Sequence, residues 1–313
     1  MLSRVADSLY WMARYIERGE HTARLVAVKL ESMVEQSRED ADASWHRVVE
    51  ALSAEEFAGK GHDAYVITQA LAFNRFNSSS LLSSLRFARD NARQVREQLS
   101  TEVWEHLNKL YLRLQPVTTE AVWGHHPARI FREALEDLHT LEGVIYSTLS
   151  HNEGWHFIQL GRHIERAQLV SRLLDLHYRQ MPGVATPKYF DWLVLLKFCT
   201  AFEPYCKAYT AQIKPETIAE FLVFDPEFPH SVRFSIDSIC DALNRVAPAA
   251  PPARRANVER LAGKLKATVD FGQIEELMSG AIVPFLADVT KQCEQIHEAV
   301  HLSYIAYGAE TVL

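Results

Sequence analysis

Hydrophobic residues recur along the chain at alternating steps of three and four positions, which is the spacing of one face of an α-helix. The first segment shows the pattern most clearly, with apolar residues at Val5, Leu9, Met12, Ile16, Ala23, Val26, Leu30 and Met33. This spacing predicts an amphipathic helix of about nine turns, which is longer than most helices of globular proteins.

The same periodicity predicts further helices downstream. They cover 41–53, 63–73, 79–99, 101–114, 127–149, 153–181, 188–208, 215–224, 230–246, 256–279 and 284–307. No pair of alternating segments is joined by a hairpin turn, which would indicate strands. The sequence therefore predicts an all-α protein built as a helical bundle.

The composition is that of an ordinary globular protein, with 48% hydrophobic and 23% charged residues. The 33 basic and 40 acidic residues give a net charge of −7. A broad nucleic-acid surface needs a dense basic face, so we expect no nucleic-acid partner.

Cysteine usage and the hydropathy of the chain indicate the compartment. The four cysteines form no C-x-x-C pair and leave the first 198 residues without one, which is typical of a reduced, cytosolic protein. The apolar stretch from Tyr189 to Phe202 is interrupted by Asp191 and Lys197 and is too short to span a bilayer. We expect a cytoplasmic protein with no membrane association.

An internal repeat indicates that the chain is duplicated. Arg14-Tyr15-Ile16-Glu17-Arg18 recurs 148 residues later as Arg162-His163-Ile164-Glu165-Arg166. Two weaker matches follow in the same order: 77–81 with 228–232, and Glu136/His139 with Glu294/His297. We therefore expect one domain, 1–313, made of two halves (about 1–150 and 151–313) related by a pseudo-two-fold axis. In such an arrangement the two Glu-Arg helices would face each other at the centre.

The Glu-Arg helices supply the candidate site. Arginine and glutamate three and four residues apart share one side of a helix, and each repeat carries more arginine than glutamate. Two interpretations stay open: buried ion pairs that fix helix register, or a pocket whose surplus arginine charge binds an anion. The candidate residues of these helices are Arg14, Glu17, Arg18, Arg24, Arg162, Glu165, Arg166 and Arg172.

Small residues lie one turn before each glutamate of the repeat, at Ala13 and Gly161. Because they carry little or no side chain, we expect another helix to approach closely there.

A metal site is the alternative interpretation of the same helices. Four-helix dimetal sites use one glutamate from each of two helices and Glu-x-x-His from each of two others. The chain offers such a set in duplicated order: Glu17, Glu136, His139, Glu165, Glu294 and His297. The adjacent arginines would repel a cation and compete for the carboxylates, so we expect no metal and no other cofactor.

The sequence resembles the bacterial alpha-E domain family over essentially its whole length. The resemblance begins at Met1-Leu2-Ser3-Arg4 and Tyr15-Ile16-Glu17-Arg18, and is strongest at Ser150-His151-Asn152-Glu153-Gly154-Trp155-His156-Phe157 followed by Glu165-Arg166. It continues through 225–232, where the family more often has arginine at the position of His230. Glu153 and Trp155, from the most similar segment, complete the candidate site.

The resemblance implies a helical fold and a functional context, but no established reaction and no catalytic residue. Members are typically encoded beside, or fused to, ATP-grasp proteins and transglutaminase-like peptidases. The resemblance thus implies an accessory protein of a peptide-modifying system that binds an ATP-grasp ligase, a transglutaminase-like protein or an anionic peptide-like ligand. The alternatives are an enzyme that acts on acyl or peptide substrates at a charged or dimetal site, and a purely structural ion-pair core.

Overall fold

The computed structural model describes residues 1–33, 38–58, 63–124, 126–179, 189–210 and 212–305, and these contain helices and loops but no strand. The expected all-helical class is therefore confirmed. None of the described helices combines the length and the apolar character that crossing a membrane would require.

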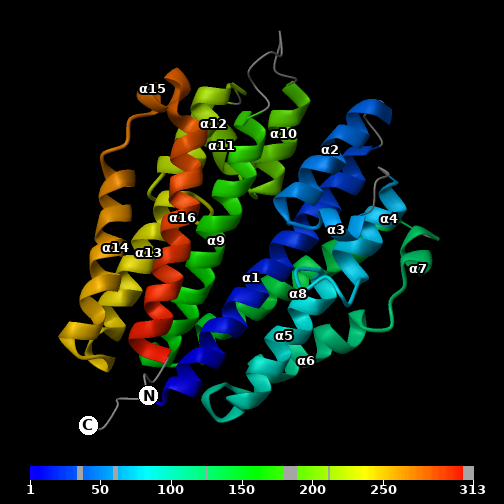
Figure 1. Ribbon diagram of the computed structural model, residues 1–313. Coiled ribbons are helices and arrows are strands. Elements are labelled where there is room, and N and C mark those ends of the chain that lie inside the picture. Colours follow the sequence, from blue (N-terminus) through cyan, green and yellow to red (C-terminus); the bar gives the residue numbers. More distant parts are fainter. Residues whose placement is uncertain (34–37, 59–62, 125, 180–188, 211, 306–313) are drawn as a thin grey trace. The chain divides into compact units, whose positions relative to one another are not determined.

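The chain divides into two compact units, each assembled from separate segments (Figure 1). The first unit holds Met1–Arg14, Ser150–Val184 and Ala201–Leu313, and the second holds Tyr15–Leu149 and Ala185–Thr200. Helix α1 (Ser3–Ser32) contributes its first turns to the first unit and the rest to the second.

The first unit is built around α9 (Glu153–Arg179), whose length carries an almost unbroken series of buried side chains. Helices α13 (Val232–Val246) and α16 (Ile282–Val300) pack along α9, and α14 (Pro252–Asp270) packs against both (Figure 1). The shorter helices α11 (Phe202–Tyr209), α12 (Pro215–Phe224) and α15 (Ile274–Glu276) lie to one side of this group.

The second unit packs α5 (Leu81–Gln94) on α6 (Thr101–Leu114), and α6 on α8 (Pro127–Thr148). Four further helices belong to this unit: α2 (Arg38–Ala51), α3 (Glu55–Ala58), α4 (Ala64–Thr68) and α7 (Thr119–Trp123). Helix α4 contacts the other three, and α7 contacts α8. Helix α10 (Tyr189–Phe198) is joined to α2 by an ion pair of 3.0 Å between Arg47 Nη2 and Asp191 Oδ1.

Two expected helices have different bounds in the structure. The prediction of a continuous helix over 188–208 is wrong. Thr200 adopts a positive φ of 56°, so α10 ends before it and α11 begins two residues after it. The helix expected over 256–279 ends at Asp270, where Phe271 leaves the helical conformation.

Two loops, one in each unit, share the same set of local hydrogen bonds. Asn74 Oδ1 accepts the N–H of Phe76 at 2.9 Å, and Asp225 Oδ1 accepts the N–H of Glu227 at 2.8 Å. Six residues after each, a serine Oγ donates to the carbonyl of that Asn or Asp and accepts the N–H that starts the next helix. These serines, Ser80 and Ser231, are thereby the N-caps of α5 and α13.

Candidate functional site

A buried ion pair joins the first Glu-Arg motif to the second within the first unit. Arg14 Nε donates to Glu165 Oε2 at 2.6 Å, and the two side chains are only 6% and 3% exposed. The remaining edges of the guanidinium donate to Gln168 Oε1 at 2.7 Å and to the Tyr10 hydroxyl at 3.3 Å. A buried guanidinium needs several acceptors, because no water replaces a missing one.

The surroundings of Arg14 keep its guanidinium charged. Burial lowers the pKa of Arg14, but Glu165 and Tyr10 offset this effect, and the pKa lies above its ordinary value. Burial raises the pKa of Tyr10 to about 12. The Tyr10 hydroxyl also lies 2.8 Å from His297 Nδ1, and the two rings stack at 5.6 Å. His297 therefore belongs to the surroundings of the Arg14–Glu165 pair.

Helices α1 and α9 approach closely at Gly161. A Cβ atom added there would lie 2.2 Å from the Tyr10 carbonyl oxygen and 3.3 Å from Ala13 Cβ. The expectation of a close helix approach at the small residues is thus confirmed.

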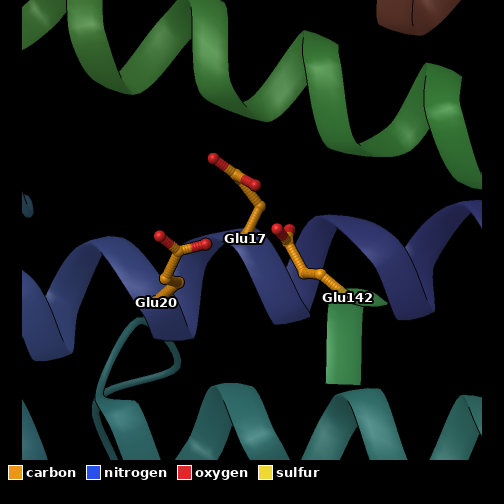
Figure 2. Close-up of side chains that lie close together, drawn as sticks. All are labelled: Glu17, Glu20 and Glu142. Carbon is orange, nitrogen blue, oxygen red and sulfur yellow. The ribbon is translucent and has the colours of Figure 1, made fainter. Parts of the chain in front are cut away.

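A second charged group lies in the second unit, where the carboxylates of Glu17, Glu20 and Glu142 turn toward one another (Figure 2). One oxygen from each lies within 4.8 Å of the others, and Glu17 and Glu20 are buried. Glu20 also forms an ion pair with Arg24. Three carboxylates at this separation are a ligand set that a hard divalent cation accepts.

The expected dimetal set is divided between the units: the second holds Glu17, Glu136 and His139, and the first holds Glu165, Glu294 and His297. Glu136 and Glu294 are exposed on α8 and α16. His139 Nε2 lies 3.0 Å from Arg24 Nη2 and 3.4 Å from Glu20 Oε1. Sequence reasoning missed Glu20 and Glu142. The sequence could have indicated Glu142, because it follows the candidate ligand His139 by three residues on the same helix.

The other candidate residues have contacts of their own. Arg18 lies over the Tyr15 ring at 5.4 Å, and Arg166 is buried and donates to the Pro229 carbonyl at 3.3 Å. The Glu153 carboxylate lies 3.3 Å from the N-terminal amino group. Arg162 and Arg172 are half-buried on α9.

A pocket of about 540 Å³ opens between α9 and α13 in the first unit. The pocket is lined by residues along one face of α9 and by residues about one turn apart on α13. The lining residues are Trp155, His156, Gln159, His163, Ser238, Asp241, Ala242, Asn244 and Arg245. Trp155 stacks on His151 at 4.1 Å and thereby forms an aromatic wall.

The two histidines of the pocket are biased toward the neutral form. Burial holds the pKa of His163 well below its ordinary value, with Arg166, Arg162 and His230 acting in the same direction. Burial, Arg245 and His151 also lower the pKa of His156. His163 is 5% exposed, and its Nδ1 has no hydrogen-bond partner among the described residues.

Comparison with known proteins places the chain in a family. Residues 1–305 match the model of the Alpha-E family, described as a predicted alpha-helical domain with a conserved ER motif. The chain belongs to this family. The Glu-Arg dipeptide occurs in this chain as Glu17-Arg18, Glu165-Arg166 and Glu259-Arg260, and Glu165 accepts from Arg14.

The chain is also similar to uncharacterized mycobacterial proteins. It is 24% identical over 319 residues to the uncharacterized proteins Mb2597 of Mycobacterium bovis and Rv2567 of Mycobacterium tuberculosis. The match covers 95% of this chain but 35% of each relative, so the chain spans about a third of their length. No solved structure matches.

Proposed function

We propose that this Alpha-E chain is a helical accessory protein that binds a peptide-like ligand in the pocket between α9 and α13. In this proposal it serves a peptide-modifying system with an ATP-grasp ligase or a transglutaminase-like protein as its catalytic partner. The observation that carries the proposal is the pocket itself. The greater length of the mycobacterial relatives agrees with a module that works beside further domains. A cytoplasmic location remains a prediction.

The chemistry of the pocket suits a peptide. Asp241 and Arg245 present opposite charges on successive turns of α13, and no ion pair joins them in the described chain. An amino group beside Asp241 and a carboxylate beside Arg245 would complement both. Trp155 offers an aromatic face, and the amides of Gln159 and Asn244 offer donors and acceptors for a peptide bond. The volume is within the range of small-ligand sites.

The free dipeptide tyrosyl-glutamate is expected to bind this pocket, measured by isothermal titration calorimetry at low ionic strength. Arg245→Ala should weaken binding about 10- to 150-fold, because a hydrogen bond to a charged group contributes about 1.5–3 kcal/mol. Arg260→Ala, at an exposed arginine of α14 outside the pocket, is the matched control and should leave affinity unchanged. Equal affinity of wild type and Arg245→Ala would contradict the proposal.

We also infer that the two halves of the chain arose by duplication and keep a pseudo-two-fold relation. The support is the spacing of the Glu-Arg motifs together with the matching hydrogen bonds of the loops Asn74–Ser80 and Asp225–Ser231, 151 residues apart. A shared local geometry at a similar spacing, here 148 residues for the motifs and 151 for the loops, is the expected trace of a repeat.

An enzyme that uses a bound metal is the second candidate function, and the clustered carboxylates of Glu17, Glu20 and Glu142 favour it. In this version the three glutamates would hold a hard divalent cation, which would supply a Lewis acid. The nearby Arg24 opposes this version, because its ion pair with Glu20 already supplies positive charge.

Elemental mass spectrometry of protein purified without chelator tests the metal version. The metal version predicts about one equivalent of magnesium, manganese, iron or zinc, bound by the three clustered carboxylates. Glu142→Gln should remove most of the metal. The control is Glu136→Gln, an exposed residue of the same helix, which should not change the metal content. Loss of metal in Glu136→Gln alone would instead support the dimetal set expected from the sequence. Metal-free wild-type protein would exclude both.

A further inference from the structure

A row of arginines follows one edge of α5 in the second unit. Arg86, Arg89, Arg93 and Arg96 are three, four and three residues apart and continue from α5 into the 3-10 turn Arg96–Gln98. Within α5 this spacing places Arg86, Arg89 and Arg93 along one side of the helix, beside the apolar stripe that α5 buries. Val95 then leaves the helical conformation with a φ of −125°, and Arg96 follows in the 3-10 turn. We call these four residues the arginine strip. At 1.5 Å per residue, its helical part from Arg86 to Arg93 is about 10 Å long.

Aromatic rings hold part of the arginine strip in place. The guanidinium of Arg89 lies over the rings of Trp104 and Tyr111 on α6, at 5.7 and 5.2 Å, and its Nε donates to Asn108 Oδ1 at 2.7 Å. The guanidinium of Arg96 also lies over the Trp104 ring, at 5.4 Å. Trp104, Asn108 and Tyr111 are spaced to share one face of α6.

Arg86 lies 4.7 Å from the ring of Phe87, its neighbour in the chain. A guanidinium stacked on a ring keeps its N–H edge available for a carboxylate. Because stacking already restricts the side chain, less conformational entropy is lost when a partner binds.

Two arginines of the strip have no carboxylate partner in the part of the chain that the structure describes. Among the described residues, neither Arg86 nor Arg96 has a carboxylate within ion-pair distance, whereas Asp90 lies 3.8 Å from Arg89 and 3.9 Å from Arg93. The arginines of α8 differ. Arg129 lies 2.8 Å from Glu133, and Arg132 lies 3.4 Å from Glu31. In a chain of net charge −7, four guanidiniums that share one described carboxylate within ion-pair distance are a local excess of positive charge.

We propose that the arginine strip is the docking surface for an acidic segment of a partner protein, with carboxylates repeated every three or four residues. Charge complementarity and the fork geometry of arginine favour carboxylates as the bound groups. A nucleic-acid strand fits less well, because the strip is short and a nucleic-acid surface needs a dense basic face. The inference rests on the accessory role proposed above, but its residues lie in the other unit and are tested separately.

Fluorescence anisotropy with a labelled octaglutamate peptide tests the proposal on the full chain at low salt. We expect saturable binding that Arg93→Ala/Arg96→Ala weakens at least tenfold. The matched control is Arg129→Ala/Arg132→Ala, which removes two exposed arginines of the same unit with the same spacing and should change affinity less than twofold. Arg89→Lys, which keeps the charge but loses the stacked fork, should weaken binding at least threefold.

Three results would overturn the proposal: no binding to the wild-type chain, equal loss in the two double variants, or tighter binding of a labelled octathymidylate than of the peptide. The tyrosyl-glutamate titration should be unaffected by Arg93→Ala/Arg96→Ala. Failure of the docking surface can therefore be distinguished from failure of the pocket.

Discussion

Replacing Glu165 with alanine is expected to lower the free energy of unfolding by about 3–5 kcal/mol, the cost of leaving a buried charge without its partner. The change leaves the Arg14 guanidinium at a site where its side chain is 6% exposed. Gln168 and Tyr10 still accept from it, but neither supplies a negative charge. Chemical denaturation with urea, followed by circular dichroism, measures the difference.

Two companion variants separate the charge from the side-chain volume. Glu165→Gln keeps a carbonyl oxygen for Arg14 Nε and should cost less than alanine. Arg14→Met/Glu165→Leu removes both charges and should recover most of the loss, because a buried pair often contributes little relative to apolar residues of similar size.

A surface pair provides the control for the buried one. Glu259 lies 3.1 Å from Arg255 but is 46% exposed, so Glu259→Ala should cost about 1 kcal/mol at most. If Glu165→Ala costs no more than Glu259→Ala, the ion pair does not hold α1 to α9. If the double variant restores stability and leaves tyrosyl-glutamate binding intact, the Arg14–Glu165 pair has a structural role, as one interpretation of the sequence holds.

The helices could be predicted from the sequence because their signals are local. Apolar residues in steps of three and four mark the buried face of α1, and Ser80 and Ser231 mark helix starts. The break between α10 and α11 could not be predicted in this way. Thr200 adopts its positive φ inside an apolar stretch that lacks glycine and proline, so tertiary packing overrides the local pattern.

For the candidate site, the sequence predicts which residues share one side of a helix, but not which residues of other helices they contact. Spacing places Arg14 and Glu17 on one side of α1, but it does not choose their partners. Glu165 lies 151 residues from the Arg14 that it binds, and Glu142 comes from α8. The pocket depends on how α13 packs on α9, and periodicity within either helix carries no information about that pairing. Of the residues that line the pocket, Trp155 is the one that the sequence indicated as a candidate site residue.

Replacing Gly161 with alanine is expected to destabilise the first unit by about 3 kcal/mol, at the upper end of the usual cost of overpacking. The added Cβ would lie 2.2 Å from the Tyr10 carbonyl oxygen. That oxygen belongs to the α1 backbone and cannot rotate away as the end of a side chain could. Helices α1 and α9 would have to separate, and the Arg14–Glu165 hydrogen bond of 2.6 Å would lengthen with them. Urea denaturation measures the loss.

Gly263→Ala is the matched control, because Gly263 is also inside a helix of the first unit and an added Cβ would meet no atom within 4 Å. Alanine should stabilise that helix by about 0.5–1 kcal/mol through its better helix propensity. The two substitutions are chemically identical, so opposite signs isolate the contact with Tyr10. A stabilising Gly161→Ala would instead mean that α1 does not approach α9 this closely. In that event the pairing of Arg14 with Glu165 would also have to be abandoned, since the same helix contact positions both.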